Sequence, residues 1–253
     1  MGKIIAFANQ KGGVGKTTSA INIAAGIGLI GKKTLMVDCD PQGNTTSGVG
    51  VRKSAIHATT YDVIIGRARA EQAIIKTEFD GLYVMPTSMP LAAAEFELAD
   101  LEHRESRLRD ALAPIKDAYD YIIIDCPPSL GLLTINALTA SDGVVIPMQC
   151  EYFSLEGLSQ IMMTVKQVKK LYNPTVSLSG ILITMYNGRL NLSVSVLDEL
   201  KKYYADKLFA TAIPRSVRVS EAPSYGQPIQ YYDKRSSTAI AYNEVARELT
   251  ERI

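Results

Sequence analysis

Short apolar runs alternate along the chain with longer segments in which apolar residues recur at helical spacing. The apolar runs, which we interpret as strands, lie at residues 4–8, 34–37, 82–85, 121–124, 143–147 and 179–184. The helical patterns lie at residues 16–29, 104–119, 132–140, 155–172, 193–204 and about 238–252. Nearly continuous apolar strands are typical of parallel sheets that are covered on both faces. The alternation predicts an α/β fold with a doubly wound, mostly parallel sheet flanked by helices.

Size and charge narrow this picture. The chain has 253 residues, of which 47% are apolar and 21% charged, and neither a repeat nor a Pro/Gly/Ser-rich linker divides it. We therefore expect a single domain over residues 1–253. Because the formal net charge is only +1, any binding to nucleic acid must depend on a local basic patch.

Cysteine usage and hydropathy indicate a cytoplasmic protein. Cys39, Cys126 and Cys150 are few and form no C-x-x-C pair, so we interpret them as small buried apolar residues in a reducing compartment. No apolar stretch approaches the roughly 20 residues that span a bilayer. We therefore expect no membrane partner.

A glycine-rich loop follows the first predicted strand and opens the first predicted helix. Residues 9–18 read N-Q-K-G-G-V-G-K-T-T. Glycines at 12, 13 and 15 allow the backbone to curl around phosphate with its N–H groups inward, and the helix N-terminus adds positive potential. Lys16 is placed to reach the β- and γ-phosphates, and Thr17 to put its hydroxyl on Mg²⁺. The loop predicts a site for ATP and Mg²⁺.

This loop departs from the usual phosphate-loop pattern at its start. The pattern G-x-x-x-x-G-K-[ST] requires glycine where this chain has Gln10. The chain gains instead a second lysine, Lys11.

Carboxylates end two of the predicted strands. Residues 35–44 read L-M-V-D-C-D-P-Q-G-N, and strand alternation points Asp38 and Asp40 the same way. One would hold Mg²⁺ or its water shell, and the other would orient the attacking water. Asp125 ends Y-I-I-I-D, the form of a Walker B site, and would bind Mg²⁺ through water. A plain turn or capping aspartate remains the alternative for each.

At this point the motifs resemble a known family. K-G-G-V-G-K-T-T with its second lysine resembles the deviant Walker A loop of the ParA/MinD ATPases. D-C-D-P-Q-G-N, D-C-P-P-S-L-G-L-L-T-I-N-A-L and I-P-R-S-V-R-V-S-E-A-P-S-Y-G-Q-P-I are similar to the ParA branch, close to its chromosomal Soj-type members. The resemblance covers essentially the whole chain.

The resemblance implies a P-loop NTPase that forms a nucleotide sandwich homodimer with ATP. Lys11 would reach across to the partner's phosphates, Gly12 would lie near the dimer contact, and Asp40 would position the hydrolytic water. Pro214 and its neighbours would line the adenine pocket. The implied nucleotide-binding residues are Lys11, Gly12, Gly13, Val14, Gly15, Lys16, Thr17, Thr18, Pro214 and Arg215. Lys11, Lys16 and Asp40 would be the catalytic residues. Thr17, Asp38 and Asp125 would bind Mg²⁺.

The resemblance also implies a function in DNA partition. The ATP dimer would bind double-stranded DNA without sequence preference, and a ParB-type centromere-binding protein would stimulate hydrolysis and release it. The output would be segregation of chromosome or plasmid by a nucleoid-associated protein. Arg189 and Arg218 match the family's DNA contacts. From the residues alone, an ordinary solvated surface explains both arginines equally well, although arginine contacts to phosphate would give salt-dependent, sequence-blind affinity.

Other functions on the same fold need features that this sequence lacks or leaves open. A MinD-like membrane ATPase, the main alternative, needs a C-terminal amphipathic helix with bulky apolar and basic residues. Here the tail A-Y-N-E-V-A-R-E-L-T-E-R-I carries several glutamates that would oppose anionic lipid. An iron–sulfur ATPase needs a bridging cysteine pair, and a bacterial tyrosine kinase needs a terminal tyrosine-rich tail. A module that only binds nucleotide is the remaining alternative. Lys11 and Asp40 argue against it, because both have expected roles in hydrolysis.

Overall fold

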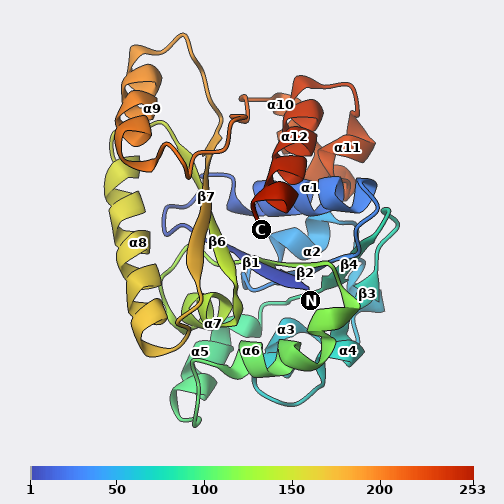
Figure 1. Ribbon diagram of the computed structural model, residues 1–253. Coiled ribbons are helices and arrows are strands. Elements are labelled where there is room, and N and C mark those ends of the chain that lie inside the picture. Colours follow the sequence, from blue (N-terminus) through green and yellow to red (C-terminus); the bar gives the residue numbers. More distant parts are fainter. Residues whose placement is uncertain (1) are drawn as a thin grey trace.

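The computed structural model describes residues 2–253 and contains one sheet of seven strands (Figure 1). The strands are β1 Lys3–Phe7, β2 Thr34–Asp38, β3 Ile75–Lys76, β4 Leu82–Met85, β5 Tyr121–Asp125, β6 Gly143–Gln149 and β7 Ser177–Thr184. Their order is β3-β4-β2-β5-β1-β6-β7, and every pairing is parallel except the edge pairing of β3 with β4. The predicted doubly wound, mostly parallel sheet is confirmed.

Helices connect the strands and flank the sheet. The α-helices are α1 Lys16–Leu29, α2 Asn44–Gly48, α3 Thr60–Ile64, α4 Ala70–Ala73, α5 Leu91–Ala99, α6 Arg107–Leu112, α7 Leu132–Ala140, α8 Ser154–Leu171, α9 Asn191–Tyr204, α10 Val217–Glu221, α11 Ile229–Tyr232 and α12 Ser237–Arg252. Short 3₁₀ turns cover Lys53–Ala55, Ala113–Ala118 and Ala222–Tyr225. Among residues 2–253, no helix is long and apolar enough to cross a bilayer.

The continuous helix predicted over residues 104–119 is wrong. Regular α-helix covers only α6, and the chain then continues as the 3₁₀ turn that contains Pro114. Proline has no N–H to donate to the preceding turn, and its ring clashes with the carbonyl four residues earlier. The other long predicted helices match α1, α7, α8, α9 and α12 to within a few residues.

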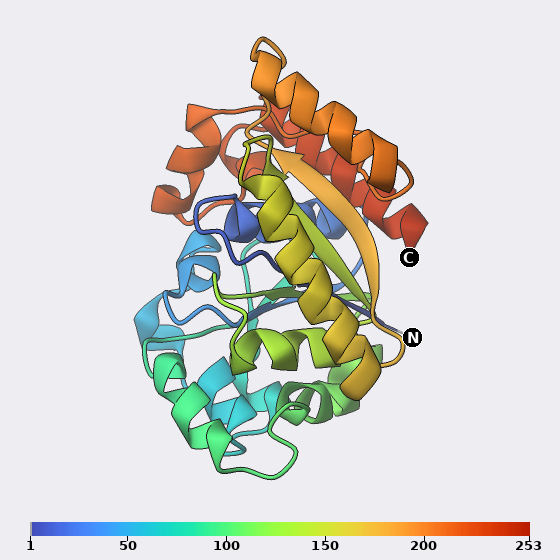
Figure 2. The ribbon, with the colours of Figure 1, turned by 90° about the vertical axis from the view of Figure 1, so that its left-hand side faces the viewer.

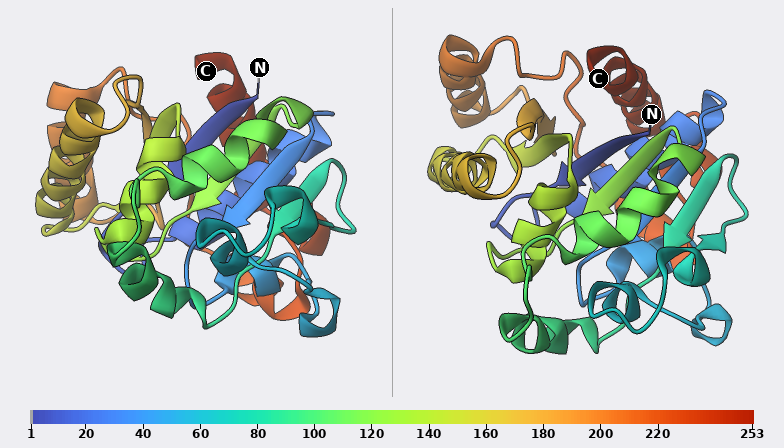
Figure 3. Two further views of the ribbon diagram at one scale, coloured as in Figure 1. Left: turned by 90° about the horizontal axis from the view of Figure 1, so that it is seen from below. Right: turned by 60° about the horizontal axis from the view of Figure 1, so that its bottom comes forward.

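Each face of the sheet has its own core, because successive side chains of a strand point to opposite faces. On β1, Ile4 and Ala6 join the core under α7 and α8, whereas Ile5 and Phe7 join the core under α1 and α12. Figure 2 shows α8 lying across β6 and β7, and Figure 3 shows α12 and the α5–α7 layer on opposite sides of the sheet. A sheet covered on both faces leaves its strand ends for function.

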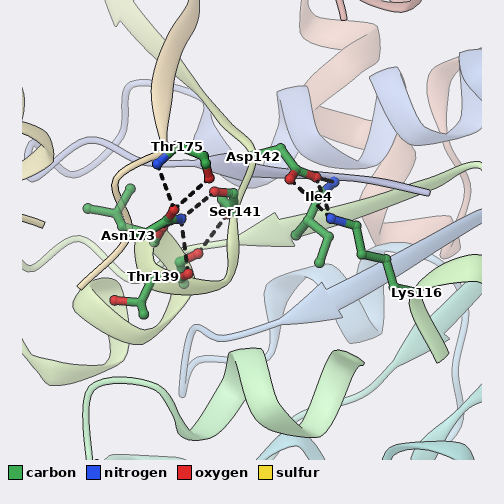
Figure 4. Close-up of polar contacts among 9 residues, drawn as sticks. Ile4, Lys116, Thr139, Ser141, Asp142, Asn173 and Thr175 are labelled. Carbon is green, nitrogen blue, oxygen red and sulfur yellow. Dashed lines mark hydrogen bonds and ion pairs between the residues drawn. The ribbon is translucent and has the colours of Figure 1, made fainter. Parts of the chain in front are cut away.

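Polar contacts fix the strands at the sheet edge where they begin (Figure 4). The carboxylate of Asp142, just before β6, accepts hydrogen bonds from the Ile4 N–H at 2.8 Å and from Lys116 Nζ at 2.9 Å. Asn173, just before β7, donates to the Ser141 carbonyl at 2.7 Å and accepts from the Thr175 hydroxyl at 2.7 Å. These contacts set the starting points of β1, β6 and β7, so the opposite strand ends are held at a defined level.

Candidate active site

The predicted phosphate loop and the predicted acidic residues meet at the carboxyl ends of the central strands. The loop leaves β1, which lies between β5 and β6 in the sheet. Asp38 ends β2 and Asp125 ends β5, and these two residues are direct neighbours in the strand register. Ligands of open parallel sheets bind at this edge.

The loop backbone adopts the conformation that its glycines were expected to allow. Gly13 and Gly15 have φ angles of 72° and 82°, in the left-handed region where a side chain is strained. The Gly13 carbonyl accepts a hydrogen bond from Gln149 Nε2 at 2.9 Å, and the Val14 carbonyl accepts one from the Thr184 hydroxyl at 2.8 Å. Within residues 2–253, the N–H groups of residues 12–18 donate no hydrogen bond. A run of such N–H groups at a helix N-terminus is suited to phosphate.

Lys16 lies beside this loop with its ammonium mostly out of solvent. Its Nζ donates to the Lys11 carbonyl at 3.2 Å. Burial lowers the pKa of Lys16, and the negative charges of Asp125 and Asp40 oppose that shift. A buried cation close to two carboxylates and to unpaired N–H groups is well placed for an anionic ligand that is itself bound to a divalent cation.

Asp125 has the features of a magnesium-site carboxylate. Its Oδ2 accepts a hydrogen bond from the Thr45 hydroxyl at 2.7 Å, and the nearby Thr17 hydroxyl opposes the rise in its pKa. Its Oδ1 is buried and has no hydrogen-bond partner within residues 2–253. Burial raises the pKa of Asp125 to about 6. The free oxygen beside Thr17 fits Mg²⁺ or one of its waters, since Mg²⁺ prefers oxygen ligands.

Asp38 was expected to hold the metal, but in this structure both of its carboxylate oxygens accept hydrogen bonds from the protein. Its Oδ1 accepts from the Asp40 N–H at 3.2 Å, and its Oδ2 accepts from the N–H and hydroxyl of Thr46 at 2.8 and 2.6 Å. Burial, followed by the charge of Asp125, raises the pKa of Asp38 to about 8. In this state Asp38 anchors the loop from Asp40 to Thr46, and its role as a metal ligand stays a prediction.

Asp40 lies at the start of that anchored loop. It is 6% exposed, and its Oδ1 accepts a hydrogen bond from the Gln42 N–H at 3.0 Å. In the part of the chain that the structure describes, no group of three His, Cys, Asp or Glu side chains could hold a metal. A magnesium ion here would therefore need phosphate or water oxygens besides the ligands from the protein.

Lys11 and Gly12 face outward at the tip of the loop. The Lys11 ammonium lies 2.5 Å from Glu151 of its own chain, and the two side chains are 35% and 52% exposed. A Cβ atom added to Gly12 would meet no atom within 4 Å. The packing of a single chain therefore does not explain why glycine stands at this position.

A cavity of about 340 Å³ adjoins the loop on the α1 side of the site. Pro214 and Arg215 line it together with Gly15 and Thr18, although they are far apart in sequence. A main-chain hydrogen bond of 2.9 Å from Tyr186 to Ile213 brings the segment before α10 alongside the end of β7. The structure thus brings the predicted adenine-pocket residues and the phosphate loop to one place.

Arg189 and Arg218, the predicted DNA contacts, lie apart from the loop and on different elements. Arg189 is exposed between β7 and α9 and forms no ion pair within residues 2–253. Arg218, on α10, lies 3.4 Å from carboxylates of both Glu221 and Asp233 and stacks over the Tyr232 ring. The two arginines therefore differ in how far their charge is already balanced.

Several residues that shape the site were missed from sequence. They are Thr45, Thr46, Gln149, Thr184 and Met185. None belongs to a phosphate-binding pattern, and only Thr45 and Thr46 follow directly on a motif that had been singled out. The three cysteines are buried and free, as expected.

Comparison with known proteins finds relatives that match nearly the whole chain. The AAA_31 family model, an AAA domain, matches residues 2–178. The chain is 54% identical to the sporulation initiation inhibitor protein Soj of Bacillus subtilis, over 98% of each chain. It is 49% identical to the chromosome-partitioning ATPase Soj of Treponema pallidum, over 100% of this chain and 98% of the relative.

A solved structure of a similar chain carries a nucleotide. It is cobyrinic acid a,c-diamide synthase from Mycobacterium smegmatis with bound ATP analogue and magnesium, which is 35% identical and superposes with a TM-score of 0.87 over 99% of this chain and 95% of that one. With the phosphate loop and the strand-end carboxylates at one edge of the sheet, these matches show that the chain belongs to the ParA branch of the ParA/MinD deviant Walker A ATPases, within the AAA_31 family.

Proposed function

We propose that the protein is an ATP- and Mg²⁺-dependent DNA-partitioning ATPase whose ATP-bound homodimer binds DNA. The observation that carries the proposal is the phosphate loop, where the N–H groups of residues 12–18 have no partner within the described chain and Lys16 and Asp125 lie beside them. The identity of 54% to Soj favours partition over the corrinoid amidation that the name of the M. smegmatis protein suggests.

In this proposal the chain's own groups bind and orient the nucleotide. The loop N–H groups and Lys16 hold the phosphates, and Pro214 and Arg215 line the cavity for the base. Thr17 and the free oxygen of Asp125 hold Mg²⁺, which neutralises charge on the phosphates when it is bound. Asp40 orients the attacking water, and Asp38 keeps the loop that carries Asp40 in place.

Dimer closure involves the exposed tip of the loop. For Lys11 to reach the phosphates of a second copy, it must leave Glu151, and an exposed ion pair of this kind costs little to break. The absence of any neighbour around a Cβ at Gly12 is consistent with a requirement for glycine that arises only when a second chain approaches.

DNA binding would depend on Arg189 first and Arg218 second. Arg189 forms no ion pair in the described chain, whereas Arg218 would have to exchange Glu221 and Asp233 for phosphate. Two copies of each in a dimer would raise the affinity by multivalency. A ParB-type partner would stimulate hydrolysis, and the protein would be cytoplasmic and nucleoid-associated.

The MinD-like alternative finds little support in the last helix. On α12, Val245, Ala246 and Leu249 are buried against α1 and its neighbours. The exposed side carries Glu244 and Glu251, which oppose an anionic membrane surface. The apolar face of this helix is thus already used within the chain.

The test is DNA binding by the purified protein with ATP, with ADP and without nucleotide. We expect tight binding only with ATP and Mg²⁺. Lys16→Ala should lose that binding, and Arg189→Glu should bind DNA about tenfold more weakly while it retains ATP binding. Lys170→Glu, on the exposed side of α8, makes the same change of charge and should bind DNA normally. Binding that ignores nucleotide and both site variants would refute the DNA switch.

A further inference from the structure

Two side chains outside the phosphate-loop motif, those of Gln149 and Thr184, donate hydrogen bonds to the loop backbone. Gln149, the last residue of β6, donates from Nε2 to the Gly13 carbonyl at 2.9 Å. The same Nε2 lies 3.1 Å from Met185 Sδ. The Val14 carbonyl is held in parallel by the Thr184 hydroxyl at 2.8 Å. The ends of β6 and β7 therefore hold two consecutive carbonyls of the loop.

Holding these carbonyls also orients the amides that a phosphate would use. A peptide unit is planar and trans, so the N–H of Val14 points opposite to the carbonyl of Gly13. A donor that draws the Gly13 carbonyl toward β6 therefore turns the Val14 N–H to the other side of the loop. That N–H has no partner within residues 2–253 and belongs to the set assigned to phosphate.

Met185 is held in a conformation that its residue type disfavours. Its φ angle is 51°, and in the described chain only one other non-glycine residue has a positive φ. Left-handed backbone at a residue with a side chain costs free energy and is concentrated at functional sites. Met185 follows β7, lines the cavity beside the loop, and places its Cε 3.9 Å from the position of a Cβ on Gly15.

We propose that Gln149 is a positioning residue that orients the Gly13–Val14 peptide for phosphate, and that Met185 holds Gln149 in place and links the loop to the cavity proposed for the base. The inference rests on the proposed nucleotide site and adds to it two residues that never touch the reacting atoms. Gln149 acts through the loop backbone, and Met185 acts through Gln149.

The first test replaces Gln149 by methionine, which keeps the length of the side chain and removes the donor. We expect Gln149→Met to bind Mg²⁺-ATP and Mg²⁺-tripolyphosphate about five- to tenfold more weakly in calorimetry, which is the usual net effect of one hydrogen bond. The amide resonance of Val14 should shift in the variant without ligand. Gln167→Met, a matched change at an exposed position of α8, should leave both affinities and the Val14 resonance unchanged.

A purely structural role for Gln149 gives a different result. It would lower the melting temperature of the variant while both affinities stay within twofold of the unchanged protein, and that outcome overturns the proposal. Failure of the unchanged protein to bind Mg²⁺-ATP would instead refute the proposed nucleotide site itself. The two failures are therefore distinguishable.

The second test uses tripolyphosphate, a ligand without a nucleotide base. Any effect of Met185 on its binding therefore cannot come from contact between Met185 and a base. We expect Met185→Leu to weaken tripolyphosphate binding about threefold in the natural background and to have no effect in the Gln149→Met background, since coupled residues are not additive. An equal loss in both backgrounds, or no loss in either, would overturn the link through Gln149.

Discussion

The buried and exposed parts of the site differ in how completely one chain prepares them. At the ends of β1, β2 and β5, Lys16, Asp38 and Asp125 are buried and surrounded by side chains of the same chain. At the surface, Lys11 pairs with Glu151, and Arg189 lies exposed. The comparison teaches that a single chain already organises the proposed nucleotide site, whereas the proposed dimer and DNA contacts would be completed only by a second molecule.

The largest expected effect comes from removing the buried cation. Lys16→Ala should lower ATP turnover by at least about 100-fold, because one group that stabilises transition-state charge is typically worth about 10²–10³ in rate. Turnover is measured by phosphate release at saturating ATP and Mg²⁺. Arg247→Ala, an exposed change on α12, serves as the control and should hydrolyse ATP normally. Turnover near the natural level in Lys16→Ala would show that this edge of the sheet is not the catalytic site.

The second effect concerns the pH dependence of stability in the protein without ligand. Burial raises the pKa of Asp38 to about 8 and that of Asp125 to about 6, above the value of about 3.9 for an unfolded chain. The folded state then binds more protons than the unfolded state, so the free energy of unfolding falls as pH rises from about 4 to 8. Each carboxyl contributes a slope of up to about 1.4 kcal/mol per pH unit.

Denaturation at several pH values measures this slope. Asp38→Asn should reduce the slope between about pH 4 and 8, and the difference should be clearest above about pH 6, where Asp125 has already titrated. The control is Asp206→Asn, an exposed position in the segment that follows α9, and it should keep the slope of the unchanged protein. Identical pH profiles for all three proteins would mean that Asp38 is not buried against Asp125 as described.

The sequence predicted only some of the residues of this site. The phosphate loop and Asp125 were found because their chemistry lies in consecutive residues next to a strand. Gln149 and Met185 were missed because they reach the loop only after β6 and β7 take their places in the sheet. The apolar strands were predictable from hydropathy, whereas β3 and α4, with two and four residues, are too short to show a period.

A smaller effect is expected at the exposed arginine. Arg189→Glu should weaken DNA binding by the ATP-bound protein about tenfold and reduce the slope of log affinity against log salt by about 1 per chain, as for a lost phosphate contact. Binding isotherms at several salt concentrations give both quantities. An unchanged slope would place the DNA surface elsewhere on the molecule.

The smallest effect is expected at the ion pair of the loop tip. Glu151→Gln should change the free energy of unfolding by less than about 1 kcal/mol, because both partners are partly exposed to solvent. Chemical denaturation at neutral pH measures it. A loss above about 2 kcal/mol would mean that Lys11 belongs to the preorganised part of the site, and the contrast between the two regions would fail.

The central claim is that the main-chain N–H groups of residues 12–18, together with Lys16, hold a triphosphate and its magnesium ion. The most direct measurement is a titration of ¹⁵N-labelled protein with Mg²⁺-ATP, followed through the amide resonances of these residues. We expect large shifts in these resonances that saturate at one nucleotide per chain and are absent in Lys16→Ala. Resonances that stay unchanged while ATP binds elsewhere, or no binding at all, would contradict it.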